Sequence, residues 1–455
     1  MFYRPEKQIG GAECEAAALK KAIISSADTI NDRKNTYYFS ENGNDSNDGF
    51  SPDKAKKSLN MISEISLSPG DTILLERGSV FRISDQIYIS CNNVSIGAYG
   101  KGDKPYVYGS VRNYADSNLW KKTDIKNVWS ANVPICPKRV GGIFFNDDSL
   151  VGNWKLYLDE LDENGDFYND NSCGIVYLYW DRGNPGTDFK SIEISTAKVA
   201  IRANDINGFY AENISFRYFT FGAFSFGESN GITVKNCIVG WCGGGVYDID
   251  AKSGCACRYG NAFQVWHLAK NIIVSHCWIY QQFDAALTFQ GFGDTPADFE
   301  NIEFSDNLIE YSSMNIEFWV GRLGVDRHIS KTENILYKGN IIRFAGYGWA
   351  GVQRYKPENQ AAILGWNYYY ENLKNFVICD NIIDCADCYM IYTKSPKEQP
   401  GLEVYNNVYY QKPTSGNHDY VEIVKGLGFM PVDENEFITA ISYFDECPKL
   451  VKWLG

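Results

Sequence analysis

Residues 271–291 read NIIVSHCWIYQQFDAALTFQG, in which short apolar strands alternate with polar corners. Cys277 and Asp284 stand where the chain is expected to turn corners between short strands. No two-residue Asn-Gly or Asp-Gly turn joins these strands, so hairpins are excluded and a coil of three strands is predicted. The residues expected to face inward are Ile272 and Val274 in the first strand, Ile279 in the second, and Leu287 and Phe289 in the third.

The same pattern recurs along the chain. Copies of the first strand are NISF at 213–216, GITV at 231–234, NIIV at 271–274, NIEF at 301–304, NILY at 334–337 and NFVI at 375–378. Six positions after the start of five of these copies stand Cys237, Cys277, Asn307, Asn340 and Asn381. Self-similarity with a period of roughly 20–50 residues marks a solenoid or propeller. Stacked coils would pair each strand in parallel with its copies. A column of inward Asn side chains would satisfy the hydrogen-bonding groups that are buried at the corners.

Two segments near the beginning of the chain carry a family resemblance. They are YFSENGNDSNDG at 38–49, followed by Ser51 and Pro52, and PGDTILLERG at 69–78. With these segments and the repeats, most of the chain resembles the right-handed parallel β-helix superfamily of pectate lyases and related carbohydrate-active enzymes. The resemblance implies an all-β, right-handed parallel β-helix. It does not specify the reaction, because that superfamily includes hydrolases, lyases, epimerases and non-enzymatic phage proteins.

Five regions are expected along the chain. Residues 12–30 have helical composition and spacing, and such a helix is a candidate to cover the open first coil of a solenoid. Trp, Tyr and charged clusters interrupt the repeat after residue 110. The predicted regions are an N-terminal capping helix at 1–35, the first coils at 36–109, a β-rich insertion at 110–198, the regular coils that carry a groove at 199–411, and a C-terminal cap at 412–455.

Composition narrows the classes of partner. The 455-residue chain has 43 Lys and Arg against 56 Asp and Glu, a net charge of −13, which argues against nucleic acid as a ligand. The sequence contains no run of about 18 apolar residues, so no membrane span is predicted. The beginning of the chain lacks an apolar signal region, so we expect a cytoplasmic protein, or a secreted one whose leader has been removed. A homo-oligomer is left open.

The 13 cysteines are expected to be mostly reduced core residues, which fits a reducing compartment. Their number is odd, so at least one is unpaired. The spacing of Cys255 and Cys257 is wrong for a zinc site, and Cys385 and Cys388 lack a partner pair. We therefore expect no metal ligands and no cofactor.

The outward residues of three consecutive coils differ from one another and predict a groove. Two Trp, two amides and a carboxylate suit a sugar ring, whose faces stack on aromatics and whose hydroxyls bond to amides. With Asp284 at a corner, Glu317 supplies a second carboxylate one coil away, as glycoside hydrolysis requires. Alone, a corner Asp often only caps a turn, and an outward Glu is often only solvated. The predicted groove consists of Gln264, Trp266, Thr288, Gln290, Glu317 and Trp319.

Other residues compete for catalytic or binding roles. Asp248 and Asp250 follow the glycine run GGGVY at 243–247 and are further catalytic candidates, although that run also suits a simple close turn. His267 follows the outward Trp266 and is a candidate for substrate binding, although a His at a strand end is more often structural. Two loops are candidates to wall the groove, with solvated loops as the alternative. They carry Arg322, Asp326, Arg327 and His328 in one loop, and Trp349, Gln353, Arg354, Tyr355 and Lys356 in the other.

These residues predict a glycoside hydrolase that acts on an oligo- or polysaccharide with paired carboxylates. A polysaccharide lyase or uronate epimerase is the alternative. It would use a base such as Arg354, Lys356, Tyr355 or His267, with calcium held by Asp248 and Asp250. A non-catalytic glycan-binding β-helix would keep the Trp residues without needing the acid pair. The sugar, the linkage, the stereochemistry and the cleavage mode stay open at this point.

Overall fold

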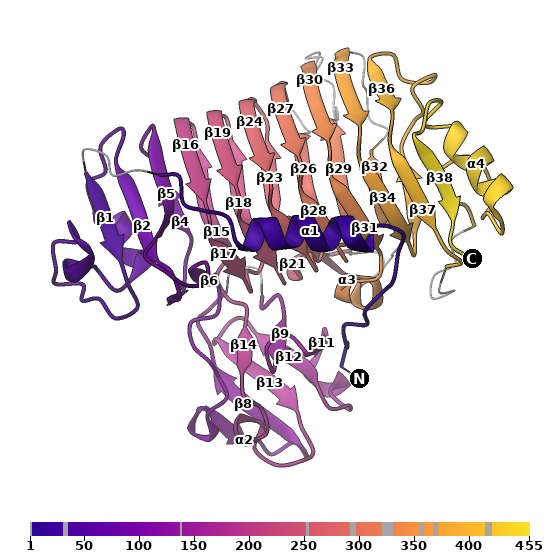
Figure 1. Ribbon diagram of the computed structural model, residues 1–455. Coiled ribbons are helices and arrows are strands. Elements are labelled where there is room, and N and C mark those ends of the chain that lie inside the picture. The colour runs from indigo at the N-terminus through magenta and orange to yellow at the C-terminus, as the bar shows by residue number, and fades with distance from the viewer. Residues whose placement is uncertain are drawn as a thin grey trace.

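Three long parallel sheets form the body of the protein (Figure 1). The computed structural model describes residues 2–30, 35–136, 139–251, 254–291, 297–320, 331–354, 359–366, 372–414 and 421–455. Successive strands along the chain go to different sheets, and each strand pairs in parallel with its copies in neighbouring coils. The chain is therefore a right-handed parallel β-helix, the hand that parallel crossovers almost always take, as the sequence predicts.

We number the three sheets I to III by the order in which the chain visits them in each coil. Sheet I consists of β1 (Thr36–Phe39), β2 (Thr72–Glu76), β5 (Val94–Tyr99), β16 (Asn207–Glu212), β19 (Asn230–Lys235), β24 (Ala269–Ser275), β27 (Phe299–Ser305), β30 (Lys331–Lys338), β33 (Asn372–Cys379) and β36 (Leu402–Tyr405). Sheet II consists of β3 (Val80–Arg82), β6 (Tyr106–Tyr108), β17 (Ser215–Arg217), β20 (Ile238–Gly240), β25 (Trp278–Tyr280), β28 (Leu308–Glu310), β31 (Ile341–Ala345), β34 (Ile382–Ala386), β37 (Val408–Gln411) and β38 (Leu450–Trp453). Sheet III consists of β4 (Ile87–Ile89), β15 (Val199–Asn204), β18 (Gly222–Gly227), β23 (Phe263–Trp266), β26 (Ala285–Gly291), β29 (Met314–Val320), β32 (Ala361–Gly365) and β35 (Tyr389–Tyr392).

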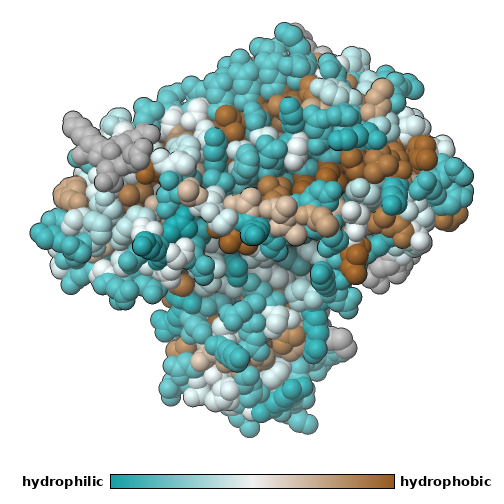
Figure 2. All heavy atoms as spheres, viewed as in Figure 1, coloured by the Kyte–Doolittle hydropathy of each residue, from teal (hydrophilic) through white to brown (hydrophobic). Residues whose placement is uncertain are grey.

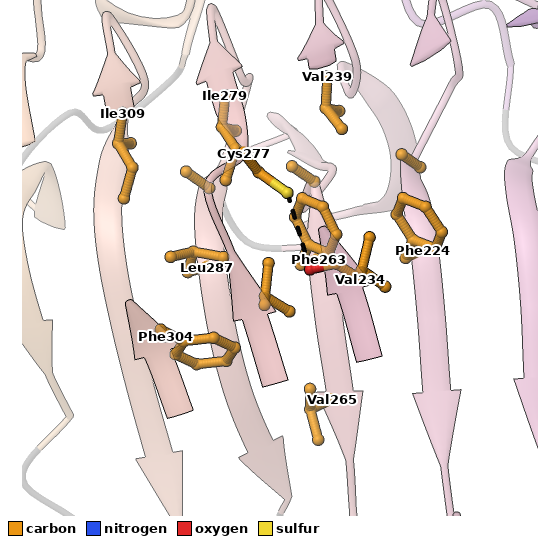
Figure 3. Packing of buried hydrophobic residues seen from close by; sticks show 14 of the residues in the cluster. Phe224, Val234, Val239, Phe263, Val265, Cys277, Ile279, Leu287, Phe304 and Ile309 are labelled. Atoms are coloured by element: carbon orange, nitrogen blue, oxygen red, sulfur yellow. Dashed lines mark hydrogen bonds between the residues drawn. The ribbon is translucent and has the colours of Figure 1, made fainter. Parts of the chain in front are cut away.

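The interior is a continuous apolar core between the sheets (Figure 3). The five residues within 271–291 that were predicted to face inward are all fully buried. Aromatic rings stack between coils, as Phe224 and Phe263 do with ring centroids 4.8 Å apart. Cys277 lies at the predicted corner, where its Sγ contacts the carbonyl oxygen of Val234. The period-two pattern of the sequence therefore sets which side chains remain for the outer surface.

A ladder of buried asparagines stabilises one corner of successive coils. Asn340 Oδ1 accepts hydrogen bonds from the backbone N and from Nδ2 of Asn307, at 3.0 and 2.9 Å. Asn340 Nδ2 donates to the carbonyl oxygen of Phe304 at 2.8 Å. The same contacts repeat through Asn381 to Asn407, so the predicted column satisfies buried polar groups in each coil.

Replacing Asn340 with alanine is expected to lower the free energy of unfolding by roughly 3 kcal/mol, because three buried polar groups lose their partner. Asn230 is the matched control, since its side chain is exposed and bonds only to the exposed Asn207 and Asn271. Asn230→Ala should change the stability by about 0.5 kcal/mol or less. Urea unfolding followed by circular dichroism measures both variants, and equal losses would contradict a special role of the buried ladder.

The N-terminal helix lies elsewhere than expected. Helix α1 (Glu13–Ile24) runs lengthwise along the outer face of sheet II (Figure 1) and does not cover the first coil. Just before its first turn, the backbone N of Gly11 donates to the carboxylate of Asp384 in β34 at 2.7 Å. Just beyond its last turn, Ser26 donates to Asn213 next to β17. The physical reason is an apolar outward row on sheet II that needs cover, made of Ile238, Trp278, Leu308, Ile341 and Ile382.

Other segments cover the two ends of the core. The 3-10 helix η2 (Leu59–Ser63) buries Leu59 and Ile62 against the core next to β4. At the other end α4 (Glu434–Ser442) buries one face in the same core beside β38. Both open ends of the core are therefore covered, as solenoids require.

Between β6 and β15 the chain leaves the coils and builds a separate β-rich unit with its own core (Figure 1). Arg217 of β17 pairs with Asp148 of this unit at 3.0 Å, which fixes it to sheet II. The view in Figure 2 shows the unit projecting from a β-helix whose surface is mainly hydrophilic on this side. The elements of the unit are β7 (Trp120–Lys122), β8 (Val128–Asn132), β11 (Asn153–Trp154), β12 (Asp166–Asp170) and β13 (Ile175–Tyr179) in one sheet, β9 (Ile143–Phe145), β10 (Leu150–Val151) and β14 (Ile192–Ile194) in another, and α2 (Pro185–Asp188).

Three further features concern the described residues alone. No helix among them is long and apolar enough to cross a membrane. All 13 cysteines are described, and each is a free thiol. Cys14, Cys173 and Cys447 are exposed, and the others are buried or half-buried, which agrees with the expectation that most cysteines are reduced core residues.

Candidate active site

The outward side chains of sheet III form the surface that the sequence predicts. Gln264 of β23 lies beside Thr288 of β26, which lies beside Glu317 of β29. In the next row Trp266, Gln290 and Trp319 stack in the same order. Because parallel strands are about 4.8 Å apart, each row brings polar or aromatic groups from three coils onto one surface.

A cleft of about 460 Å³ opens over these rows. The hairpin of β21 (Gly245–Ile249) and β22 (Ala256–Tyr259) contributes to one wall, and the short helix α3 (Trp349–Gln353) brings in Arg354. The lining is rich in aromatic rings, as expected of a surface that contacts the faces of a sugar. The aromatic residues that line it are Phe221, Tyr247, Tyr259, Trp266, Trp319 and Trp366. The polar residues that line it are Asn261, Gln264, Asp284, Gln290, Glu317 and Arg354.

Glu317 lies on the floor of the cleft with 6% of its surface exposed. Trp366 Nε1 donates to Glu317 Oε1 at 2.8 Å, and Thr288 Oγ1 is 3.1 Å from Oε2. Burial and the nearby Asp284 carboxylate raise the pKa of Glu317 to about 7, although the two hydrogen bonds and Arg354 oppose the shift. Near neutral pH this carboxyl group therefore retains a proton that it can transfer.

Asp284 is buried at the corner before β26 and forms an ion pair. Its Oδ1 accepts a hydrogen bond from Arg354 Nη1 at 2.5 Å. Arg354 follows α3, which is anchored because Trp349 Nε1 donates to the carbonyl oxygen of Gln281 at 2.9 Å. Arg354 pairs with Asp284, whereas Glu317 accepts hydrogen bonds from the uncharged Trp366 and Thr288, so the two acids of the cleft are in different environments.

The remaining predicted residues fall in different places. Thr288 is fully buried and supports Glu317 rather than lining the cleft. His267 lines an adjoining hollow, where burial lowers its pKa. Arg322 and Tyr355 lie outside the described residues, as do Asp326, Arg327, His328 and Lys356.

Asp248 and Asp250 are exposed and do not line the cleft. They belong to the hairpin that overhangs the groove, as the sequence suggested, but Tyr247 takes the position over the cleft. The register of β21 and β22 shifts between Val246 and Asp248, so Tyr247 lies at a bulge, a feature that redirects side chains. The structure therefore does not bring this pair of carboxylates together with Asp284 and Glu317.

Sequence reasoning missed Trp366, Tyr259, Tyr247 and Asn261. A signal for Trp366 was present, because AAILGW at 361–366 continues the repeat by one more coil. In the structure Leu364 pairs with Glu317, and Trp366 follows beside Trp319 with ring centroids 6.4 Å apart. Tyr247, Tyr259 and Asn261 lie in or next to the hairpin, which interrupts the repeat, so periodicity could not place them.

Another hollow, of about 470 Å³, lies on the outer face of sheet I. It follows an exposed asparagine ladder that includes Asn301 and Asn334. Among its described lining residues Glu303 is the one carboxylate. Paired-carboxylate chemistry therefore has no place there, and the cleft on sheet III is the candidate active site.

The arrangement in the cleft provides two distinct acid–base functions. A carboxyl group whose pKa is raised to about 7 can act as a general acid near neutral pH. A carboxylate held by an arginine can act as a nucleophile or as a base. In many enzymes, two acids in different environments act as the general acid and as the base or nucleophile of one site.

Comparisons with known proteins concern the fold. No family description matches the chain, and no curated protein sequence matches it. Among solved structures, one described as a glycoside hydrolase is 11% identical, with 92% of this chain and 96% of that chain covered and a TM-score of 0.45. A GH136 lacto-N-biosidase from Eubacterium ramulus is 15% identical, with 92% and 68% covered and a TM-score of 0.37. A pectate lyase is 11% identical, with 89% and 83% covered and a TM-score of 0.40.

Proposed function

We propose that this protein is a glycoside hydrolase that cleaves an oligo- or polysaccharide in the cleft on sheet III. The observation that carries the proposal is a buried Glu317, whose pKa is raised to about 7, in the same aromatic-lined cleft as an arginine-bound Asp284. A non-catalytic glycan-binding protein would need the rings but not this pair of acids. The proposed reaction uses the two carboxyl groups and needs no cofactor.

In the proposed mechanism Glu317 donates its proton to the glycosidic oxygen as the bond to the anomeric carbon breaks. Asp284 either attacks the anomeric carbon directly or removes a proton from a water molecule that attacks it. In the first case a water molecule then hydrolyses the glycosyl–enzyme ester, and Glu317 takes up the proton that this water loses. Arg354 would hold Asp284 in place throughout, because their ion pair is buried.

Arg354 is a poor general base, which weakens the case for a lyase that would use this residue. An arginine side chain stays protonated in proteins, and this one is already paired with Asp284. The predicted acid pair for calcium, Asp248 and Asp250, is also exposed on the hairpin and away from the cleft lining. A hydrolytic role for the cleft therefore accounts for more of its described residues.

A panel of aryl glycosides and uronate polysaccharides tests the proposal. Release of the aglycone or of new reducing ends supports hydrolysis, and proton NMR of the first product shows whether its anomeric configuration is retained. Unsaturated uronates, detected by their ultraviolet absorbance and lost on adding a chelator, would replace the proposal with a lyase. Glycan binding without any product would leave a binding protein.

The pH dependence of the reaction follows from the acid role. Because Glu317 must be protonated and its pKa is raised to about 7, kcat/KM should fall as the pH rises through about 7. The decline should approach about tenfold per pH unit, as for loss of one essential proton. Initial rates across the pH range on the best substrate measure this limb. A rate that rises through the same range would mean that Glu317 acts as a base.

A further inference from the structure

The hollow that His267 lines, also of about 460 Å³, adjoins the catalytic cleft on the side of the earlier coils. The two cavities share Phe221, Gln264 and Trp266 as lining residues. The two cavities are therefore neighbours on the outer face of sheet III, and an extended glycan in the cleft would reach toward this hollow.

Arg202 of β15 is the central residue of this hollow. It lies beside Ser225, which lies beside Gln264, so it belongs to the same outward row as Thr288 and Glu317. Four strand spacings of about 4.8 Å separate Arg202 from Glu317, or about 19 Å along the row. A group bound by Arg202 is therefore well removed from the bond that Glu317 would protonate.

The two cations of the hollow, Arg202 and Lys198, lack an ion-pair partner within the part of the chain that the structure describes. No ion pair joins Arg202 or Lys198 to any described residue, and Arg202 Nε is buried without a hydrogen bond. Glu228, the one carboxylate among the described lining residues, is exposed and forms no ion pair with either cation. Buried donors are normally satisfied, so the unpartnered Nε of Arg202 in this cavity indicates a missing acceptor.

The acceptor that fits best is an oxyanion. A guanidinium offers a planar fork of donors that matches a carboxylate or sulfate group, and a lysine adds a mobile positive charge. Neutral polar groups surround the cations, among them Gln86 and Asn204, whose side-chain oxygens are also buried without donors. These oxygens suit sugar hydroxyls, so the hollow offers contacts for a whole anionic sugar.

We propose that this hollow binds a carboxylate- or sulfate-bearing sugar of the substrate through Arg202 and Lys198. The inference rests on the proposed hydrolase function, and it makes the substrate an anionic oligosaccharide. The anionic sugar would lie about 19 Å from the cleavage point, several strand spacings away along the same row. The cleft around Glu317 would then determine the reaction, and this hollow would determine which glycans are accepted.

The test uses full-length protein with Glu317→Gln, which should bind substrate without turning it over. A printed array of neutral, uronate-bearing and sulfated oligosaccharides identifies the bound glycans, and calorimetry measures the affinity of the strongest. We expect anionic glycans to bind best, and the array separates uronates from sulfates. Adding Arg202→Gln should weaken their binding about tenfold or more, as loss of a hydrogen-bonded charge does. Lys198→Gln should weaken it less, and Lys121→Gln, which removes an exposed charge on the β-rich unit, should leave it unchanged.

The remaining outcomes separate this inference from the proposed function. Binding of neutral glycans alone would overturn the anionic subsite and leave the hydrolase standing. Anionic glycans that bind equally well to the Arg202 and Lys198 variants would also overturn the subsite. Binding of no glycan would count against the proposed function and therefore against both.

Discussion

Replacing Glu317 with glutamine is expected to lower kcat by roughly 10²–10⁴-fold, the usual contribution of a general acid. Glutamine has the same shape, and its oxygen can still accept the hydrogen bond from Trp366 that the structure shows. What the variant lacks is the transferable proton that the raised pKa of Glu317 provides at neutral pH. Steady-state kinetics on the best substrate of the glycoside panel measures the loss.

A comparison of leaving groups makes this prediction specific. A dinitrophenyl glycoside needs little protonation as it departs, so Glu317→Gln should retain much more of its activity on that substrate. Glu300→Gln is the matched control, because Glu300 lies on sheet I and pairs with Lys270 at the surface. Equal losses on both kinds of substrate would show that Glu317 does not act as the acid.

The rows of the candidate site were predictable because a β-helix converts sequence period into position. Once Leu287 and Phe289 face inward, Thr288 and Gln290 must face outward, and the repeat length sets which coils are neighbours. The observed register between β23, β26 and β29 is the predicted one. Trp366 follows the same rule one coil later, because AAILGW at 361–366 continues the repeat.

The ion pair between Asp284 and Arg354 could not be predicted in this way. Both residues were candidates, but 70 positions of chain separate them, and Arg354 follows a helix that departs from the repeat. Its location depends on the packing of Trp349 against Phe283 and on the hydrogen bond of Trp349 to Gln281. Contacts of this kind arise from tertiary packing, which leaves no period in the sequence.

The N-terminal helix shows a second limit of the same reasoning. Its composition predicts a helix, and the structure contains one, but helical propensity says nothing about which surface the helix covers. The outward row of sheet II is itself apolar in five consecutive coils, from Ile238 to Ile382. A scan of outward positions for apolar runs would have indicated that this face needs a cover, and α1 provides it.

Asp284→Asn is expected to lower kcat by roughly 10³-fold or more, because the variant lacks the nucleophile or base of the proposed reaction. The pH dependence of the remaining activity distinguishes loss of this carboxylate from a nonspecific loss of activity. Asp284 raises the pKa of Glu317, so its neutralisation should lower that pKa, and the freed Arg354 should lower it further. The alkaline limb of the residual activity should therefore shift below its wild-type position near pH 7.

Two controls show whether the loss in Asp284→Asn comes from unfolding and whether Asp284 or Asp248 is the catalytic carboxylate. Breaking a buried ion pair costs about 3–5 kcal/mol, so thermal unfolding must first show that Asp284→Asn is folded at the assay temperature. Asp248→Asn is the informative comparison, since the sequence made Asp248 an alternative catalytic residue and the structure places it outside the cleft lining. We expect Asp248→Asn to retain activity within about twofold, because an exposed substitution of this kind perturbs little. If instead Asp248→Asn abolished turnover and Asp284→Asn did not, the reaction would have to take place under the β21–β22 hairpin, and the buried pair on sheet III would be structural.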